Sequence, residues 1–187
     1  MLHHLSRFVQ ISAVFSLLLI PLGCGDAKTA KTNGKQGGNG KASNDADFVN
    51  KAAIAGMAEV ELGKLALKQS SDAEVKKFAQ HMIDDHTKAN DELKALAKKK
   101  NMQVPDKLDS EHQATVDRLA KLKGEEFDAE YKKVQVDDHV TAVELFENQS
   151  KNGADADWRK FAGDTLPTLQ DHLKMARNLA AGKSIDH

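Results

Sequence analysis

Two short sequences recur in this chain at one fixed spacing, and this repeat limits the possible folds more than any other feature. Val60-Glu61-Leu62 returns as Val143-Glu144-Leu145, and Lys77-Phe78-Ala79 returns as Lys160-Phe161-Ala162, each 83 residues further on. Single matches at the same spacing include Lys68/Lys151, Asp72/Asp155 and Ala73/Ala156. Because the matches stay in one register without a gap, we expect two copies of one structural unit.

Each copy has the pattern of a helical hairpin. Prolines are absent between Ser43 and Pro105 and again until Pro167, and aromatic residues make up only 5% of the chain, which favours long helices over strands. We expect long helices over 48–69, 72–100, 124–150 and 155–181. Turns are expected near Ser71 and Gly153, and a short amphipathic helix within 108–122.

Two similar hairpins predict an all-α four-helix bundle, because each hairpin must bury its apolar stripe against a partner. The segment between the hairpins has about twenty residues, which is enough to cross the length of the bundle as in ferritin-like folds. The predicted bundle covers residues 46–182, and 183–187 form a C-terminal tail.

The N-terminus is typical of an export signal. Phe8–Leu22 is an uncharged, largely apolar run that follows Arg7 and is too short to span a bilayer. It ends at Gly23-Cys24, which holds the only cysteine of the chain. We therefore expect residues 1–23 to be a lipoprotein-type signal peptide and Cys24 to be lipidated. Because Pro21 stands where such signals usually have Leu, ordinary secretion with cleavage near Ala27 is the alternative.

Residues 24–45 are predicted to be a flexible tether, because Gly25–Ser43 has no large apolar side chain to bury. A lipidated Cys24 would make the membrane one partner of the protein. The expected location is the periplasm or the outer membrane of the cell envelope, and a secreted, soluble protein is the alternative.

Several motifs resemble those of the domain-of-unknown-function family numbered 4142. The matching residues are Glu59–Ala66, Met82–Thr87, Phe127-Asp128, Tyr131 and Leu166–His172. The resemblance covers nearly the whole chain after Asp45. It implies an exported bacterial protein of ferritin-like fold, often labelled as an outer-membrane protein, and implies no activity.

Histidines at mid-height of the predicted helices are the main candidates for a functional site. His86 and His172 lie on apolar stripes, and His139 lies at the edge of one. At roughly 1.5 Å per residue, each is about 22 to 27 Å from its hairpin turn, which is the middle of the bundle. Glu59 or Glu61 falls at the same level. Together they predict a transition-metal site for Zn, Fe, Mn or Cu.

The alternative interpretation is that these histidines are hydrogen-bonded core residues, for example His86 with Tyr131. A di-iron site is disfavoured, because the positions three residues before two of the histidines are Ile83 and Leu169 instead of Glu. Asp85, Asp138 and Asp171 directly precede the histidines, and each is a candidate hydrogen-bond partner for a histidine of a neighbouring helix. Met57, Met82 and Met175 are alternative thioether ligands for Cu(I).

Several function classes are excluded. With 27 Lys and Arg against 28 Asp and Glu, the chain lacks the positive field of nucleic-acid-binding proteins. It has no glycine-rich phosphate loop, so no nucleotide is expected. It also has no serine in a nucleophile elbow, which disfavours a hydrolase. Two hypotheses remain: an envelope bundle that binds a metal ion, and a non-catalytic bundle that binds an envelope protein or the cell wall.

Overall fold

A computed structural model describes residues 40–186, with side chains from Asp45 onward, and the regular elements in this part of the chain are all helices. The five helices are α1 (Gly40–Gln69), α2 (Ala73–Lys99), α3 (Ser110–Leu119), α4 (Gly124–Asn152) and α5 (Ala156–Ala180). The predicted all-α class is therefore confirmed. The expected signal peptide and Cys24 lie outside the described residues. None of the helices from α1 to α5 is both long and apolar enough to cross a membrane.

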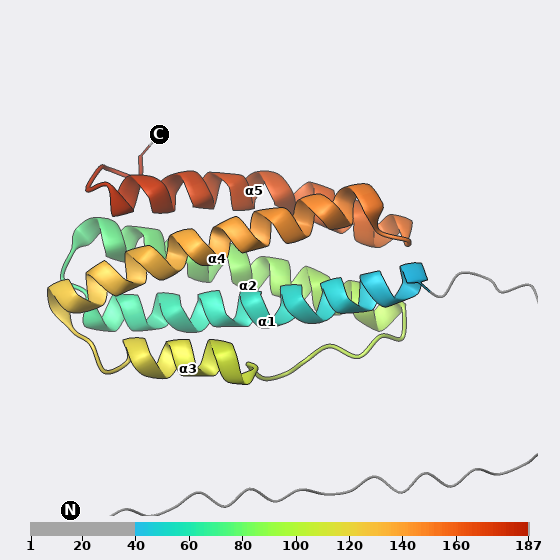
Figure 1. Cartoon of the computed structure of the whole chain (residues 1–187), viewed down its shortest axis with the longest axis horizontal. Coiled ribbons are helices and arrows are strands. Elements are labelled where there is room, and N and C mark those ends of the chain that lie inside the picture. Colours follow the sequence, from blue (N-terminus) through green and yellow to red (C-terminus); the bar gives the residue numbers. More distant parts are fainter. Residues whose placement is uncertain (1–39, 187) are drawn as a thin grey trace, which may run out of the picture. The chain divides into compact units, whose positions relative to one another are not determined.

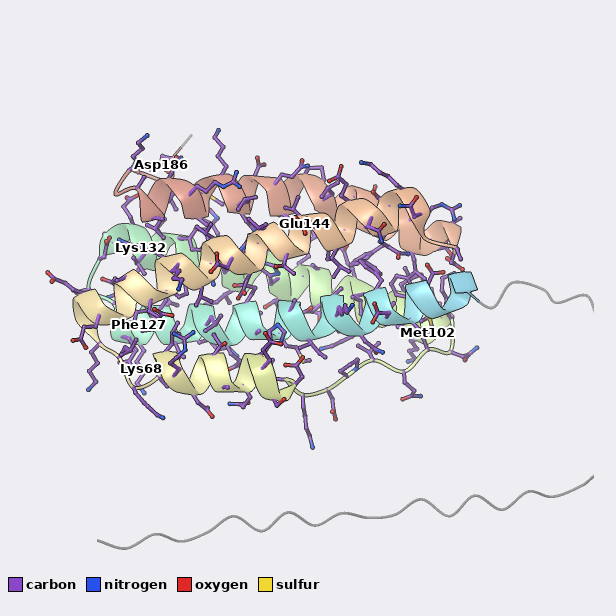
Figure 2. The ribbon with its side chains drawn as sticks, viewed as in Figure 1. Lys68, Met102, Phe127, Lys132, Glu144 and Asp186 are labelled. Carbon is purple, nitrogen blue, oxygen red and sulfur yellow. The ribbon has the colours of Figure 1, made fainter. Side chains whose placement is uncertain are left out.

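The four long helices form a bundle of two antiparallel hairpins, α1–α2 and α4–α5 (Figure 1). α1 packs against α4, and α2 packs against α5. The segment between the hairpins runs the length of the bundle and carries α3 along the outer side of α1. Met102 therefore lies at one end, and Lys68 and Phe127 lie at the other (Figure 2). This is the crossover predicted for a ferritin-like bundle.

The two hairpins begin their second helices in the same way. The Asp72 side chain accepts hydrogen bonds from the backbone N–H groups of Glu74 and Val75 at the start of α2. Asp155 does the same for Asp157 and Trp158 at the start of α5. Aspartate is a preferred N-cap, since it satisfies amide groups that have no partner within the helix. Both caps hold equivalent positions of the 83-residue repeat.

The core consists of two apolar clusters, one toward each end of the bundle. The first contains Leu62, Phe78, Met82, Tyr131 and Leu179, among others. The second contains Phe48, Leu93, Phe146, Trp158 and Leu169, among others. Along each of the four long helices, a polar residue lies between the two clusters: Glu59, His86, His139 and His172. The bundle therefore has a buried polar layer at mid-height.

Both boundaries of the bundle differ from the sequence-based prediction. α1 begins at Gly40, within the predicted tether 24–45. Asp45 is buried because its carboxylate accepts hydrogen bonds from Gln149 Nε2 and from the N–H groups of Ala154 and Asp155. The predicted tail is not free either: Ile185 is buried in the first cluster, and its N–H donates to Glu74.

Candidate metal site

Three histidines from three helices meet in the polar layer. His86, His139 and His172 are only 8%, 1% and 2% exposed. One ring nitrogen of each lies within 4.8 Å of the other two, and the ring centroids are 5.4 to 5.6 Å apart. The structure therefore brings His86, His139 and His172 together, as the spacing of the sequence predicted.

Hydrogen bonds fix which nitrogen of two of these rings is free. His139 Nδ1 lies 2.9 Å from the carbonyl oxygen of Gln135, which can only accept, so Nδ1 donates and Nε2 keeps its lone pair. His172 Nε2 lies 2.9 Å from Asp85 Oδ2, so Nε2 donates and Nδ1 keeps its lone pair. His139 Nε2, His172 Nδ1 and His86 Nε2 are all buried and have no hydrogen-bond partner among residues 45–186.

The three rings are neutral at ordinary pH. Burial lowers the pKa of His139 to about 4. Burial, together with the neighbouring His139, lowers the pKa of His172 to about 4, although the Asp85 carboxylate opposes this shift. The pKa of His86 is lowered well below its usual value by burial and then by the two other histidines. Neutral imidazoles with free lone pairs are the form that binds metal ions.

Glu59 belongs to the polar layer but is oriented by another group. Gln135 Nε2 donates to Glu59 Oε2 at 2.7 Å. The other oxygen, Oε1, lies 3.8 Å from His139 Nδ1, the nitrogen that already donates to Gln135. Burial raises the pKa of Glu59 to about 7. Between pH 4 and 7 both the Glu59 carboxyl group and the His139 ring are therefore mostly neutral, and their contact is not an ion pair. Glu59 therefore lies beside the histidine cluster, not among its free nitrogens.

Glu61, the other predicted carboxylate, does not reach the cluster. It is exposed on α1, and its Oε1 pairs with Lys64 Nζ at 2.8 Å one turn away. Glu144, its equivalent in the repeat, is also exposed, on α4 (Figure 2). Since two helix positions separate Glu59 from Glu61, only one of them can face the core, and that residue is Glu59.

The aspartates beside the histidines have three different environments. Asp85 is the partner of His172 from the neighbouring helix, as one alternative predicted. Asp171 is exposed. Asp138 is partly buried, and its pKa is raised to about 7 by burial and then by Glu59.

The methionines considered as thioether ligands pack among apolar side chains. Met82 lies in the first apolar cluster, and Met175 packs against that cluster.

One residue of the site, Gln135, was not predicted from the sequence, and one predicted contact, between His86 and Tyr131, is absent. Gln135 is fully buried and connects Glu59 to α4 through its side chain, while its carbonyl orients His139. Its position one helical turn before His139 was the one sequence feature that could have indicated that it lies on the same face of α4. Tyr131 does not serve as the hydrogen-bond partner of His86, since its hydroxyl lacks a partner in the described part of the chain.

A cavity of about 450 Å³ adjoins the cluster. Glu59, His86 and His139 line it, together with apolar residues of the second cluster that include Leu93, Phe146 and Phe161. Exposed residues near the start of α3, among them Asp109 and Glu111, also line it, so the cavity opens to solvent. His172 instead lines a separate cavity of about 270 Å³ with Asp85.

The fold and the site together define a class of protein, a helical bundle with a buried cluster of three histidines. The chain belongs to the family described as a domain of unknown function, DUF4142, whose model matches residues 30–179. This confirms the resemblance seen in the sequence motifs. Among curated proteins, none matches the chain.

Solved structures of similar fold include two DUF305 proteins and CopM, which was solved in a Cu(II)-bound form. A DUF305 fragment from Deinococcus radiodurans gives a TM-score of 0.66 at 14% identity and covers 74% of this chain and 96% of its own. A DUF305 protein from Streptomyces coelicolor gives 0.64 at 15% identity, covering 77% and 96%. CopM in its Cu(II)-bound form gives 0.63 at 20% identity, covering 74% and 96%. At these identities the likeness shows a shared helical-bundle fold.

Proposed function

We propose that this protein is an exported metal-binding bundle that holds one copper ion through His86 Nε2, His139 Nε2 and His172 Nδ1. One observation carries the proposal: one ring nitrogen of each of three buried imidazoles lies within 4.8 Å of the other two, and each ring has a buried nitrogen without a hydrogen-bond partner among the described residues. Leaving three buried acceptors without a partner costs free energy, about 1–3 kcal/mol for each group. A shared metal ion would remove that cost at all three positions.

The hydrogen bonds behind two of the rings support the same assignment. Histidine ligands usually donate their second N–H to a carbonyl or a carboxylate, which orients the ring and raises its basicity. His139 does so to Gln135 and His172 to Asp85. With metal–nitrogen bonds of about 2.0–2.1 Å, three ligand nitrogens around one ion lie about 3.3–3.6 Å apart. Because the ring nitrogens of the three histidines lie within 4.8 Å of one another, each needs to move toward a shared ion by less than about 1 Å.

Copper is the preferred ion for a site made of nitrogen ligands alone. Affinity for such ligands rises along the first-row series to Cu(II) and then falls at Zn(II). Mn prefers carboxylate ligands, and non-haem Fe(II) sites typically combine two histidines with one carboxylate, whereas here Glu59 is held by Gln135. The similar fold of CopM, solved with Cu(II) and with Cu(I), adds support from outside the chain. Zn(II) is the second choice.

Export is the second part of the proposal, and it rests on the N-terminal sequence. The apolar run before Gly23-Cys24 has the length and polarity of a signal peptide. Lipidation of Cys24 would anchor the bundle in the periplasm or at the outer membrane. Mass spectrometry of the N-terminus of the exported protein tests this directly: a diacylated Cys24 supports anchoring, and an unmodified N-terminus near Ala27 supports the secreted form.

The metal content of the full chain, expressed without a His-tag and exported, tests the site. We expect about one copper ion per chain, lost on chelation, and a melting temperature that rises with added copper, since a ligand of the folded state stabilises it. The double variant His86→Leu with His172→Leu should lose the metal and keep its helical circular dichroism. The matched control is His81→Leu, because His81 is an exposed histidine on α2. It should keep the metal.

The opposite result is equally clear. Metal content at background, with a melting temperature that Cu, Zn, Fe and Mn all leave unchanged, would refute the metal site. The histidines would then be packed core residues, and the search would turn to a protein partner in the cell envelope.

A further inference from the structure

The three histidines leave room for another ligand on the bound metal. Copper, zinc and cobalt ions usually take four or more ligands, and a site with three protein ligands keeps a position open to solvent or substrate. Glu59 does not fill that position, because Gln135 holds one of its oxygens and the other lies nearest to the donating nitrogen of His139. Within the described part of the chain, no further carboxylate, cysteine or histidine belongs to the cluster, so this position is open to a ligand from solution.

The cavity of about 450 Å³ provides the route and the space. It is lined by two histidines of the cluster, His86 and His139, and it opens to solvent beside the N-terminal end of α3. Its volume falls within the range of small-molecule sites, about 300–1,000 Å³. A molecule larger than water can therefore reach the metal from this side.

The lining of the cavity selects among classes of small molecule. The exposed carboxylates of Asp109 and Glu111 line its opening against a single lysine, Lys51, while the carboxyl groups of Glu59 and Asp138, which also line it, are buried and partly buried. This charge disfavours an anion. The inner wall is apolar and includes Leu93, Phe146 and Phe161, all buried in the second cluster, so a nonpolar body gains free energy there.

We infer that this cavity binds a small organic molecule with a neutral nitrogen donor, such as an azole or an amine, and a nonpolar body. The nitrogen completes the coordination of the metal, and the nonpolar body lies against Leu93, Phe146 and Phe161. This inference rests on the proposed metal site, since the donor atom binds the ion that the three histidines hold.

Cobalt(II) gives a direct test, because its visible absorption bands change with coordination. The full chain is loaded with Co(II), desalted and titrated with 4-phenylimidazole, imidazole and benzoate in turn, and the cobalt content is measured again at the end. We expect 4-phenylimidazole to change the spectrum in a saturable way. Burial of its phenyl ring should make it bind at least about tenfold more tightly than imidazole. Benzoate, an anion of similar shape, should leave the spectrum unchanged.

Ala142→Phe is the matched variant, because Ala142 lines the cavity and packs against the second cluster. It should retain Co(II) and bind 4-phenylimidazole no more tightly than imidazole. Ala129→Phe places the same side chain at an exposed position of the same helix and should behave as the wild type.

The outcomes separate the two proposals. If Co(II), Cu(II) and Zn(II) all fail to bind, the metal site is refuted and this inference falls with it. If Co(II) is retained but 4-phenylimidazole binds no better than imidazole, or benzoate binds equally well, the metal site stands and the proposed ligand class is wrong. Unchanged discrimination in Ala142→Phe would show that the ligand does not occupy this cavity.

Discussion

The hydrogen bond between Asp85 and His172 makes the sharpest prediction about metal affinity. Asp85 Oδ2 accepts from His172 Nε2 at 2.9 Å, which leaves Nδ1 free to bind the metal. Asp85→Asn keeps an acceptor oxygen but removes the negative charge that makes the ring more basic. Asp85→Ala removes both. Loss of such a partner typically lowers metal affinity about 10- to 100-fold.

The exposure of Asp85 sets where in this range each variant should fall. Its side chain is 43% exposed, so water screens part of its charge. We therefore expect Asp85→Asn to weaken copper binding about tenfold, or about 1.4 kcal/mol. Asp85→Ala should weaken it further. The assay is a competition titration against a chromogenic copper chelator at pH 7.

Asp171→Asn is the control for the loss of a charge near the site. Asp171 is exposed, directly precedes His172 and lines the same small cavity as Asp85. Its removal should leave the dissociation constant within about twofold of the wild type, as expected for exposed charges. If both Asp85 variants bind copper as tightly as Asp171→Asn does, the assigned tautomer of His172 is wrong.

Three further predictions concern stability, each measured by urea unfolding of the metal-free protein. Burial raises the pKa of Glu59 to about 7, so the folded state keeps a proton that the unfolded chain loses above pH 4.5, and stability falls as the pH rises from 4.5 to 7. Glu59→Gln should thus stabilise the protein at pH 8 by up to about 3 kcal/mol and change little at pH 4, and an equal effect at both pH values would contradict this. For His172 the sign is opposite: burial lowers its pKa to about 4, so its contribution is complete above pH 6.5 and is lost as the pH falls toward 4. Between pH 6.5 and 5 the wild type should therefore lose up to about 2 kcal/mol more stability than His172→Leu, which has no ring to protonate. An identical loss in both proteins would argue against a buried neutral ring. Asp45→Ala removes three hydrogen bonds and should cost about 2–4 kcal/mol, whereas exposed Asp47→Ala should cost less than about 0.5 kcal/mol.

The fold was largely predictable because the repeat and the amphipathic stripes are local patterns. Asp72 and Asp155 were predicted as equivalents, and both cap the second helix of their hairpin. The ends of the bundle were less predictable. Asp45 is buried where the last turn of α4 and the loop that follows it, more than a hundred residues away, offer it three donors. No local pattern carries that information.

The site was predictable where a histidine interrupts an apolar stripe, as at His86 and His172. His139 was less certain, because the buried face of α4 is itself partly polar and includes Asp128, Gln135 and Gln149. A hydrophobic pattern cannot identify such a face. The choice between Glu59 and Glu61 had the same difficulty, and it depended on the rotation of α1 relative to its neighbours.

The histidine cluster does not follow the symmetry of the repeat, so the two hairpins contribute to it unequally. The repeat equivalents of His86, His139 and His172 are Leu169, Gly56 and Ala89. Two identical hairpins would present every histidine twice or not at all, so the present single set requires that the two copies differ. The first hairpin supplies His86, and the second supplies His139 and His172. Neither hairpin holds the cluster alone, so the site exists only where the two halves of the bundle pack together.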